Sequence, residues 1–204
     1  MYKYFIKPIF DILFAIILIF ALLPIFFILI IVLCIINKGK PFFRQKRVGK
    51  GNKIFTIFKF KTMNDKRGQD GQLLPDNQRL TFIGKIIRET SIDEIPQLFN
   101  ILKGEMSFIG PRPLLVRYLP FYTNKEKRRH NVKPGISGYA QIKGRNTLNW
   151  NERLSLDVYY VDNISMYLDL KIAYYTLLKV IKREDVALVP NNLMEDLDVE
   201  RAEK

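Results

Sequence analysis

The chain has 204 residues, with 33 Lys and Arg against 20 Asp and Glu, and its formal net charge is +13 at pH 7. It contains one cysteine, Cys34, and one histidine, His130, so a disulfide framework and a cysteine-based zinc site are excluded. The single histidine also leaves a histidine-based triad or metal cluster with little to work with.

An apolar run without a single charge extends over residues 12–36. As a straight helix it would be roughly 37 Å long, which is enough for a hydrocarbon core of about 30 Å. A cleaved signal peptide has an apolar region of about 7–15 residues followed by a small-residue cleavage site. We therefore expect this segment to stay attached and to lie in a membrane.

Pro24 stands at the midpoint of this run, and both flanks are basic. The proline ring removes a backbone donor and clashes with the preceding turn, so a kink is expected there. Lys3 and Lys7 precede the run, and several cations follow it from Lys38 onward. The positive-inside rule favours cytoplasmic placement of both flanks, which a re-entrant helix broken at Pro24 allows. A kinked span with its N-terminal flank outside is the alternative.

The charge is distributed unevenly. Residues 37–64 hold nine Lys or Arg and no acid, whereas residues 184–204 hold seven acids and two bases. Anionic lipid head groups and phosphate-bearing substrates suit a basic field next to a membrane segment. Nucleic acid is a third candidate, which the neighbouring membrane segment disfavours.

The sequence predicts an α+β fold that is mostly helical. Alternation and β-branched residues indicate a strand at 53–62, then a polar loop at 63–75. Helical periodicity follows at 76–90 and 91–102, with a rigid turn at 110–113 and a short strand at 139–142. A helix at 167–183 has a wide apolar arc, which either packs on the core or lies in the membrane interface.

Three parts of the chain follow from this pattern. Residues 1–36 are expected to form a re-entrant membrane helix hairpin. Residues 37–183 are expected to form a cytosolic catalytic domain with a small β element and interfacial amphipathic helices. The acidic tail at 184–204 has little to pack and is expected to be disordered.

Asp93 and Glu94 are adjacent carboxylates with two possible explanations. In the first, Ser91 and Glu94 form a capping box, and acids in a first turn suit the helix dipole; Pro96 speaks against regular helix geometry. In the second, the two side chains point about 100° apart and have different catalytic roles. One attacks a phosphorus, and the other holds Mg²⁺, which takes one or two carboxylates plus substrate phosphates.

Several cations stand on constrained backbone around this pair. Lys59 lies on one face of the expected strand, and Arg88 precedes the acids by five residues. Arg112 lies between two prolines, and Arg145 follows Gly144 in a glycine-punctuated loop. Arginine binds phosphate oxygens bidentately. The combination with a membrane anchor predicts a diphosphate site at a lipid surface.

Several motifs resemble the bacterial sugar transferases, the monotopic phosphoglycosyl transferases. The resemblance covers about residues 3–183. The length of the chain, close to the bare catalytic core of that family, suggests a minimal member. The segments that carry it are 58–63 (FKFKTM), 91–100 (SIDEIPQLFN), 102–113 (LKGEMSFIGPRP), 133–141 (KPGISGYAQ), 144–146 (GRN) and 157–160 (DVYY). Several long motifs in order are far more specific than any one short pattern.

The resemblance implies an enzyme that moves a sugar 1-phosphate from a UDP-sugar to a polyprenyl phosphate, usually undecaprenyl phosphate, and releases UMP. Asp93 would be the nucleophile that forms a covalent phosphosugar intermediate, and Glu94 would be a Mg²⁺ ligand. The phosphate-binding groups would be Lys59, Arg88, Arg112 and Arg145, and the membrane helix would be broken at Pro24. Such enzymes act at the cytoplasmic face of the bacterial inner membrane and open glycoconjugate pathways (capsule, O-antigen, exopolysaccharide or glycoprotein). Downstream glycosyltransferases are possible partners, and nucleic acid is not expected.

Two other functions remain as alternatives. A non-catalytic membrane adaptor would bind anionic lipid or nucleic acid through the basic stretch, would weaken steeply with salt and would not need Asp93 or Glu94. A glycosyltransferase that moves the sugar without its phosphate would release UDP in place of UMP.

Overall fold

The computed structural model describes residues 1–144, 148–182 and 195–202. The helices are α1 (Lys7–Ile36), α2 (Asp76–Arg79), α3 (Phe82–Glu89), α4 (Leu98–Leu102), α5 (Tyr139–Lys143), α6 (Trp150–Asp162), α7 (Met166–Lys182) and α8 (Leu197–Ala202). The strands are β1 (Phe42–Val48), β2 (Ile54–Phe60), β3 (Ser107–Ile109) and β4 (Gly135–Ser137). One π-helical turn, η1 (Tyr2–Ile6), and four 3₁₀ segments, η2 (Lys50–Asn52), η3 (Ile92–Gln97), η4 (Val116–Phe121) and η5 (Glu126–Asn131), complete the elements.

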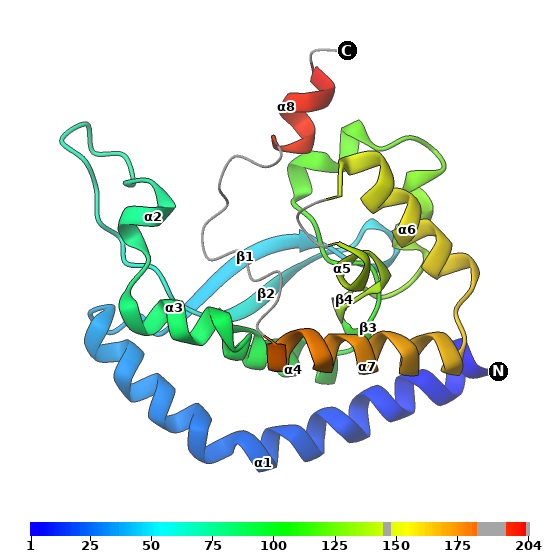
Figure 1. The fold of residues 1–204 in the computed structure, drawn as a ribbon, viewed down its shortest axis with the longest axis horizontal. Helices are drawn as coiled ribbons and strands as arrows, with labels where there is room; N and C mark the ends of the chain where they lie inside the picture. The colour runs from blue at the N-terminus through cyan, green and yellow to red at the C-terminus, as the bar shows by residue number, and fades with distance from the viewer. Residues whose placement is uncertain (145–147, 183–194, 203–204) are drawn as a thin grey trace.

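Helix α1 lies under the rest of the molecule as a long bowed rod (Figure 1). With η1 it forms one helical stretch, Tyr2–Ile36, that is long and apolar enough to cross a membrane. Pro24 stands inside it, and the helix bends about midway along its length (Figure 1). Both ends of α1 rise toward the rest of the domain, and the bend points away from it (Figure 1).

The N-terminal half of α1 is fastened to the domain by polar contacts. Lys7 Nζ lies 2.7 Å from Asp169 Oδ2 in α7, and the Tyr2 hydroxyl donates to the same oxygen at 2.6 Å. The Tyr160 hydroxyl donates to Asp169 Oδ1 at 2.7 Å. Farther along, the Asp11 carboxylate accepts from the backbone N–H of Phe108 at 3.3 Å. An apolar helix therefore meets the domain through buried charge at this end.

The C-terminal half of α1 packs through aromatic rings. Phe26 contacts Phe42, Phe60 and Phe99 at ring-centroid distances of 5.2 to 6.1 Å. At the helix end, Asn37 Nδ2 donates to the carbonyl oxygen of Lys61 at 2.9 Å. The two halves are thus held by the same domain through separate contacts.

Two small sheets organise the domain above α1. Strands β1 and β2 pair antiparallel with Phe42 opposite Phe60, and β3 pairs parallel with β4. The inward face of β2 carries Phe55 and Ile57, which pack against Ala15 of α1 and Met106 in one core cluster. Lys59 continues this face by period-2 alternation, so the strand delivers a cation to the inner side of the domain.

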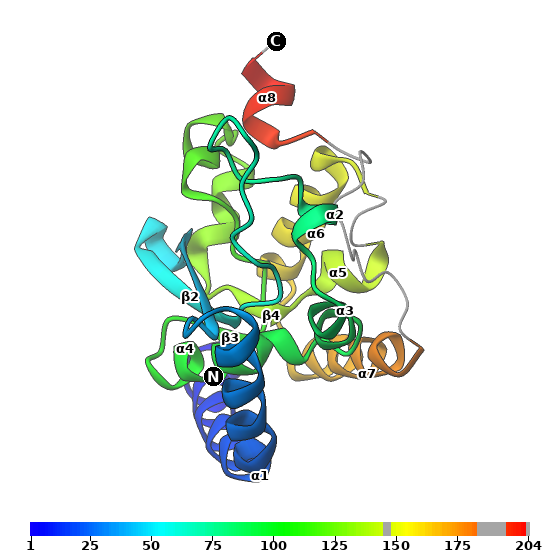
Figure 2. The ribbon, with the colours of Figure 1, turned by 90° about the vertical axis from the view of Figure 1, so that its left-hand side faces the viewer.

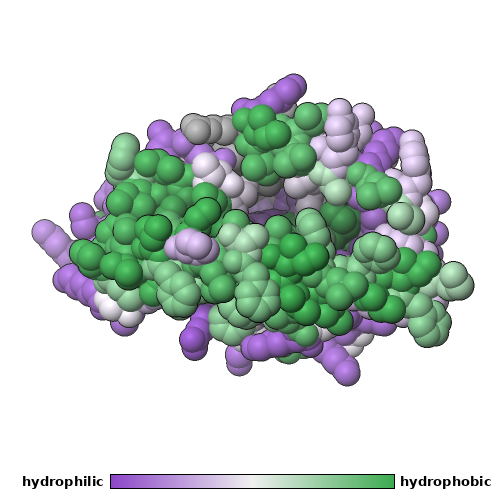
Figure 3. Space-filling model, turned by 90° about the horizontal axis from the view of Figure 1, so that it is seen from below, coloured by the Kyte–Doolittle hydropathy of each residue, from purple (hydrophilic) through white to green (hydrophobic). Residues whose placement is uncertain are grey.

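Helices α3 and α7 both lie above α1, with α3 to the left and α7 to the right in the view of Figure 1; Figure 2 shows α1 as the lowest element. The view from below shows apolar surface along α1 and a second apolar patch on the far side of a hollow with hydrophilic residues inside (Figure 3). The exposed large apolar residues of α7 are Met166, Tyr167, Leu170, Tyr174, Tyr175, Leu177 and Ile181. The opposite side of α7 buries Leu168 and Ile172 in the core, which confirms packing on the core for that part of its apolar arc. The membrane-interface role of the exposed part stays a prediction.

The mostly helical fold with a small β element and one long apolar N-terminal helix is confirmed, and the strand at β2 and the helix at α7 lie where expected. The strand expected at 139–142 is wrong, because residues 139–143 form α5 and the strand is at 135–137. The helix expected at 76–90 is interrupted at Leu80, whose backbone is extended. Strand β1 and helix α6 were not predicted.

The acidic C-terminal stretch differs from the expectation of disorder in its described part, residues 195–202. Leu197 of α8 is fully buried, and Arg201 forms a two-pronged ion pair with Glu126. The Trp150 indole N–H donates to the backbone oxygen of Glu195 at 2.9 Å. A buried leucine, ion pairs and hydrogen bonds therefore dock this segment on the domain.

Candidate active site

Asp93 and Glu94 lie in the 3₁₀ segment η3, between α3 and α4. Their side chains are each 13% exposed, so both carboxylates are mostly withdrawn from water. Ser91 adopts a left-handed backbone with φ of 56° and gives no side-chain cap. The capping-box explanation of this pair is therefore wrong, and the tight turn serves to direct two carboxylates inward.

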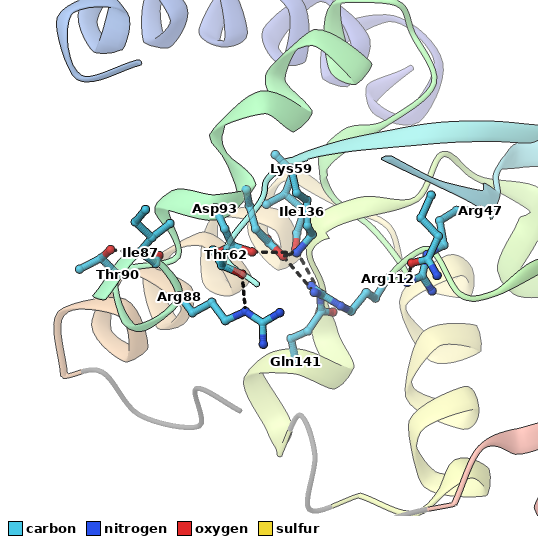
Figure 4. Close-up of polar contacts among 12 residues, drawn as sticks. Arg47, Lys59, Thr62, Ile87, Arg88, Thr90, Asp93, Arg112, Ile136 and Gln141 are labelled. Atoms are coloured by element: carbon cyan, nitrogen blue, oxygen red, sulfur yellow. Dashed lines mark hydrogen bonds and ion pairs between the residues drawn. The ribbon is translucent and has the colours of Figure 1, made fainter. Parts of the chain in front are cut away.

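Lys59 bridges the two acids. Its Nζ lies 3.2 Å from Asp93 Oδ2 and 2.5 Å from Glu94 Oε1 (Figure 4). Arg112 Nη2 donates to the same Glu94 oxygen at 2.9 Å. Elements far apart in the chain, β2, η3 and the turn at 110–113, thus meet at one point.

The two carboxylates have pKa values that are shifted in opposite directions. Burial raises the pKa of Glu94, but Lys59 and Arg112 outweigh burial and hold that pKa well below its ordinary value. Burial and the charge of Glu94 raise the pKa of Asp93 above its ordinary value, although Lys59 acts in the opposite direction. Glu94 is therefore the permanently charged member, and Asp93 is the member that gains a proton as the pH falls.

Arg88 reaches the site from α3. Its Nε donates to the Thr62 hydroxyl at 2.9 Å, and its guanidinium extends past Asp93 toward Gln141 (Figure 4). Burial lowers the pKa of Arg88, while Asp93 raises it. Arginine stays charged at neutral pH under such a shift. Arg88 therefore adds a second guanidinium beside the nucleophile candidate.

A fully buried ion pair holds the Arg112 turn from behind. Arg129 Nη2 donates to the backbone oxygen of Arg112 at 2.6 Å and to Asp157 Oδ2 at 2.8 Å. The side chains of Arg129 and Asp157 are only 1% and 2% exposed. The Arg112 side chain itself is 43% exposed, so the site is open to solvent along part of this side chain. Next to this pair, burial and the charge of Arg129 lower the pKa of His130 to about 3, which leaves it neutral.

The carboxylates suit a Mg²⁺ ion that completes its shell from a substrate. Both cationic contacts of Glu94 fall on Oε1, so they engage one side of its carboxylate. Within residues 1–144, 148–182 and 195–202, no group of three or more His, Cys, Asp or Glu could hold a metal ion. An all-protein cage is thus not offered, but Mg²⁺ commonly binds one or two carboxylates plus phosphates and water.

An apolar pocket lies between α1 and the η3–α4 segment, the segment that carries the acids. Its lining residues are Ile19, Leu22, Leu23, Phe26, Phe27, Ile95 and Phe99. Ile95 follows Glu94 in the chain, so the wall of this pocket continues into the turn that carries both carboxylates. An apolar chain in the pocket would bring an attached polar group close to the site.

Of the seven expected site residues, five lie together in the structure: Asp93, Glu94, Lys59, Arg88 and Arg112. Arg145 lies outside the described residues. Pro24 lies inside α1, between pocket-lining residues Leu23 and Phe26.

Sequence reasoning did not identify four further residues around this cluster, namely Thr62, Arg129, Gln141 and Asp157. Asp157 and Gln141 stand in motifs that carried the resemblance, and a buried acid in α6 is a signal that helix periodicity could have given. Thr62 also stands in such a motif, at 58–63.

Comparison with known proteins identifies the family of the chain. Residues 2–183 match the model of the bacterial sugar transferase family, and the chain belongs to this family. It is 56% identical over 149 residues to the uncharacterized sugar transferase EpsL of Bacillus subtilis, with 72% of this chain and 74% of that protein aligned. It is 40% identical to the UDP-N-acetylgalactosamine-undecaprenyl-phosphate N-acetylgalactosaminephosphotransferase of Aeromonas hydrophila, over 85% of this chain and 43% of that protein.

A third relative is the UDP-glucose:undecaprenyl-phosphate glucose-1-phosphate transferase of Klebsiella pneumoniae. The identity is 37%, over 83% of this chain and 38% of that protein. The chain therefore spans less than half the length of the two relatives whose names state a reaction. The shared part is the one that contains the Asp93–Glu94 site.

Proposed function

We propose that this protein is a phosphotransferase that moves a sugar 1-phosphate from a UDP-sugar to undecaprenyl phosphate or a similar polyprenyl phosphate. The observation that carries the proposal is the Lys59-bridged Asp93–Glu94 pair beside Arg88 and Arg112. The named reactions of the Aeromonas and Klebsiella relatives support the same donor and acceptor classes.

The reaction has two displacement steps. In the first, a carboxylate oxygen of Asp93 attacks the β-phosphorus of the UDP-sugar, and the bond from that phosphorus to the bridging oxygen breaks, so UMP leaves. In the second, an oxygen of the lipid phosphate attacks the same phosphorus, and the bond to Asp93 breaks. The lipid diphosphate sugar is released, and the carboxylate is restored.

The cations stabilise the charge that develops in both steps. Lys59 contacts both acids, and in this proposal Arg88 and Arg112 bind phosphate oxygens. Glu94 would hold Mg²⁺, which when bound neutralises phosphate charge. Because Lys59 opposes the rise in the pKa of Asp93, it also keeps the nucleophile ionised over a wider range of pH.

The membrane helix is re-entrant in this proposal. Lys7 at one end of α1 pairs with Asp169, and Asn37 at the other end bonds to Lys61, so one domain holds both ends. A span of the bilayer would separate these ends by a hydrocarbon core of about 30 Å and would break one set of contacts. The apolar patches seen from below would then rest in one leaflet, with the hollow between them open to lipid (Figure 3).

The acceptor reaches the site from this leaflet. Its polyprenyl chain occupies apolar surface such as the pocket of α1 and α4, and its phosphate meets Asp93 from below. The protein works on the cytoplasmic face of a bacterial cell membrane, where the soluble nucleotide sugar is present. It begins the assembly of a lipid-linked glycoconjugate.

Product analysis tests the proposal. The purified protein is incubated with Mg²⁺, undecaprenyl phosphate and each of a panel of UDP-sugars, and nucleotide products are separated. Release of UMP that requires Asp93 and Glu94 is expected. Release of UDP would indicate sugar transfer without phosphate, and salt-sensitive lipid binding with no product from any donor would favour a non-catalytic adaptor.

A further inference from the structure

Gln141 has one satisfied and one unsatisfied end. Its Nε2 donates to the backbone oxygen of Ile136 at 3.2 Å, and since only the amide nitrogen can donate, this bond identifies the opposite atom as the oxygen. That oxygen, Oε1, is buried and has no hydrogen-bond partner within the described residues. The residue is 7% exposed. A buried acceptor without a partner is destabilising, so a ligand group is the natural partner.

The Gln141 side chain is directed into the candidate active site. It lies between the Arg88 and Arg112 side chains, on the side of them that is opposite the acid pair (Figure 4). Gly110 N donates to the backbone oxygen of Ser137 at 2.8 Å, which brings the start of α5 against the Arg112 turn. The fit is tight, because a Cβ added at Gly138 would lie 2.2 Å from the Gly110 oxygen and 2.6 Å from Gln141 Oε1.

The chemistry of an amide oxygen limits what it can bind. Ionised phosphate oxygens only accept hydrogen bonds, so Oε1 repels them, although two arginines that attract phosphate stand beside it. A partner must offer O–H or N–H within a short distance of the phosphate. On the donor substrate, the sugar joined to the β-phosphate carries such groups, as hydroxyls or an amide N–H.

We propose that Gln141 is a sugar-binding residue, whose Oε1 accepts a hydrogen bond from a hydroxyl or amide N–H of the sugar held next to the β-phosphate. This inference rests on the proposed function and adds a contact that recognises the transferred group. The two arginines bind the phosphates that all UDP-sugars share, and Gln141 recognises a polar substituent of the sugar. Loss of that substituent leaves the oxygen buried and unpaired, which is a strong basis for discrimination.

The test compares the wild type with Gln141→Leu, which has a similar size and lacks the acceptor. Both are assayed by UMP release with the accepted UDP-sugar and with each of its monodeoxy analogues. We expect the variant to lose about 5–20-fold in kcat/KM with the parent sugar, mainly through the KM of the donor, as for one lost hydrogen bond. The KM of the lipid acceptor is expected to stay unchanged.

A double-mutant cycle identifies the contact. One analogue should be used poorly by the wild type and should suffer no further loss with Gln141→Leu. The inference is overturned if the variant discriminates among all analogues as the wild type does. It is also overturned if inhibition by UMP weakens by the same factor as kcat/KM, because Oε1 would then contact the uridine part.

A second variant protects the test against misfolding. Gln141→Glu keeps an acceptor at this position but loses the donor to Ile136, so it should be slower with every donor yet retain discrimination against the same analogue. If Gln141→Leu does not fold, as judged by thermal unfolding, loss of that discrimination in Gln141→Glu overturns the inference. If the wild type releases UMP and both variants have the same kinetic parameters as the wild type, this inference is overturned and the proposed function is not. Absence of UMP release from the wild type sinks the proposed function, and the inference falls with it.

Discussion

The ammonium group of Lys59 lies 3.2 Å from the carboxylate of Asp93, at the end of a strand whose inner face is otherwise apolar. Lys59 thus occupies a position of β2 at which the alternating pattern predicts an apolar core residue. Two acids balance its charge there. A largely buried cation with its partners aligned in this way is costly to assemble and suits a site that binds negative charge.

The activity should depend on the ionisation of Asp93. Burial and Glu94 raise its pKa, so kcat/KM is expected to be full above that pKa and to be lost as the pH falls through it. The loss should begin at a higher pH than an ordinary aspartate, with a pKa of about 3.9, would give. A pH–rate profile of UMP release measures this. Full activity down to the range of an ordinary aspartate would contradict the assignment.

Removal of the Lys59 charge should shift the pH at which activity is lost on the acid side of the pH–rate profile. In Lys59→Met, the pKa of Asp93 loses its main lowering influence and is expected to rise further, so the acid side of the pH–rate profile moves to higher pH. Lys61→Met is the matched control, since Lys61 contacts Asp65 and not the acid pair. Equal shifts in both variants would mean that Lys59 acts only through the general positive field.

The Arg129–Asp157 pair should support both stability and donor binding. Asp157→Asn leaves a buried guanidinium without its counter-charge, so the free energy of unfolding should fall by about 3–5 kcal/mol. The double variant Arg129→Met with Asp157→Leu should recover much of this stability in chemical denaturation.

The double variant separates stability from function. It still lacks the bond from Arg129 to the Arg112 backbone oxygen, so the KM of the UDP-sugar should stay raised. A stable double variant with normal donor KM would show that this pair has no part in positioning Arg112.

Both ends of α1 should be accessible from the cytoplasm. In a Cys34→Ala background, Lys3→Cys and Lys40→Cys are expected to react with a membrane-impermeant maleimide in inside-out vesicles and not in intact cells. The reason is that contacts to one domain hold both ends. Labelling of the two positions from opposite sides would contradict the re-entrant arrangement and would indicate a kinked span.

The metal requirement should depend on Glu94. In Glu94→Gln, the Mg²⁺ concentration that gives half-maximal UMP release is expected to rise by about tenfold or more, since even indirect partners of a metal change affinity about 10–100-fold. A Mg²⁺ titration of the initial rate, with donor and acceptor saturating, measures this. An unchanged half-maximal concentration would remove Glu94 as the ligand.

Local pattern was enough to predict some of the fold. The charge-free run at 12–36 predicted the long helix, and alternation at Phe55 and Ile57 predicted β2, because each element has a strong period of its own. The polar anchors of α1 were not predictable, since Lys7 and Asp169 are 162 residues apart in the chain. Helix α5 was mistaken for a strand because a five-residue segment is too short for its period to decide.

The same limit applies to the site. Lys59, Asp93, Glu94 and Arg112 were named from residue type and constrained backbone, and the structure brings them together. The turn around Asp93 was harder to predict, because Ser91 takes a left-handed backbone that the capping-box pattern does not foresee. Gln141 stood in a recognised motif, but only the tertiary contact of α5 with the Gly110 turn shows that its oxygen is left without a partner.

Trapping the enzyme in mid-reaction tests the central claim most directly. The protein is incubated with Mg²⁺ and a UDP-sugar labelled in the β-phosphate, without any lipid acceptor, and is then analysed by intact-mass and peptide-mass spectrometry. We predict one equivalent of sugar phosphate bound to the peptide that contains Asp93, with stoichiometric UMP, and discharge of the label on addition of undecaprenyl phosphate. An Asp93→Asn variant that traps label and turns over normally, or a wild type that forms product while never carrying label, would contradict the account.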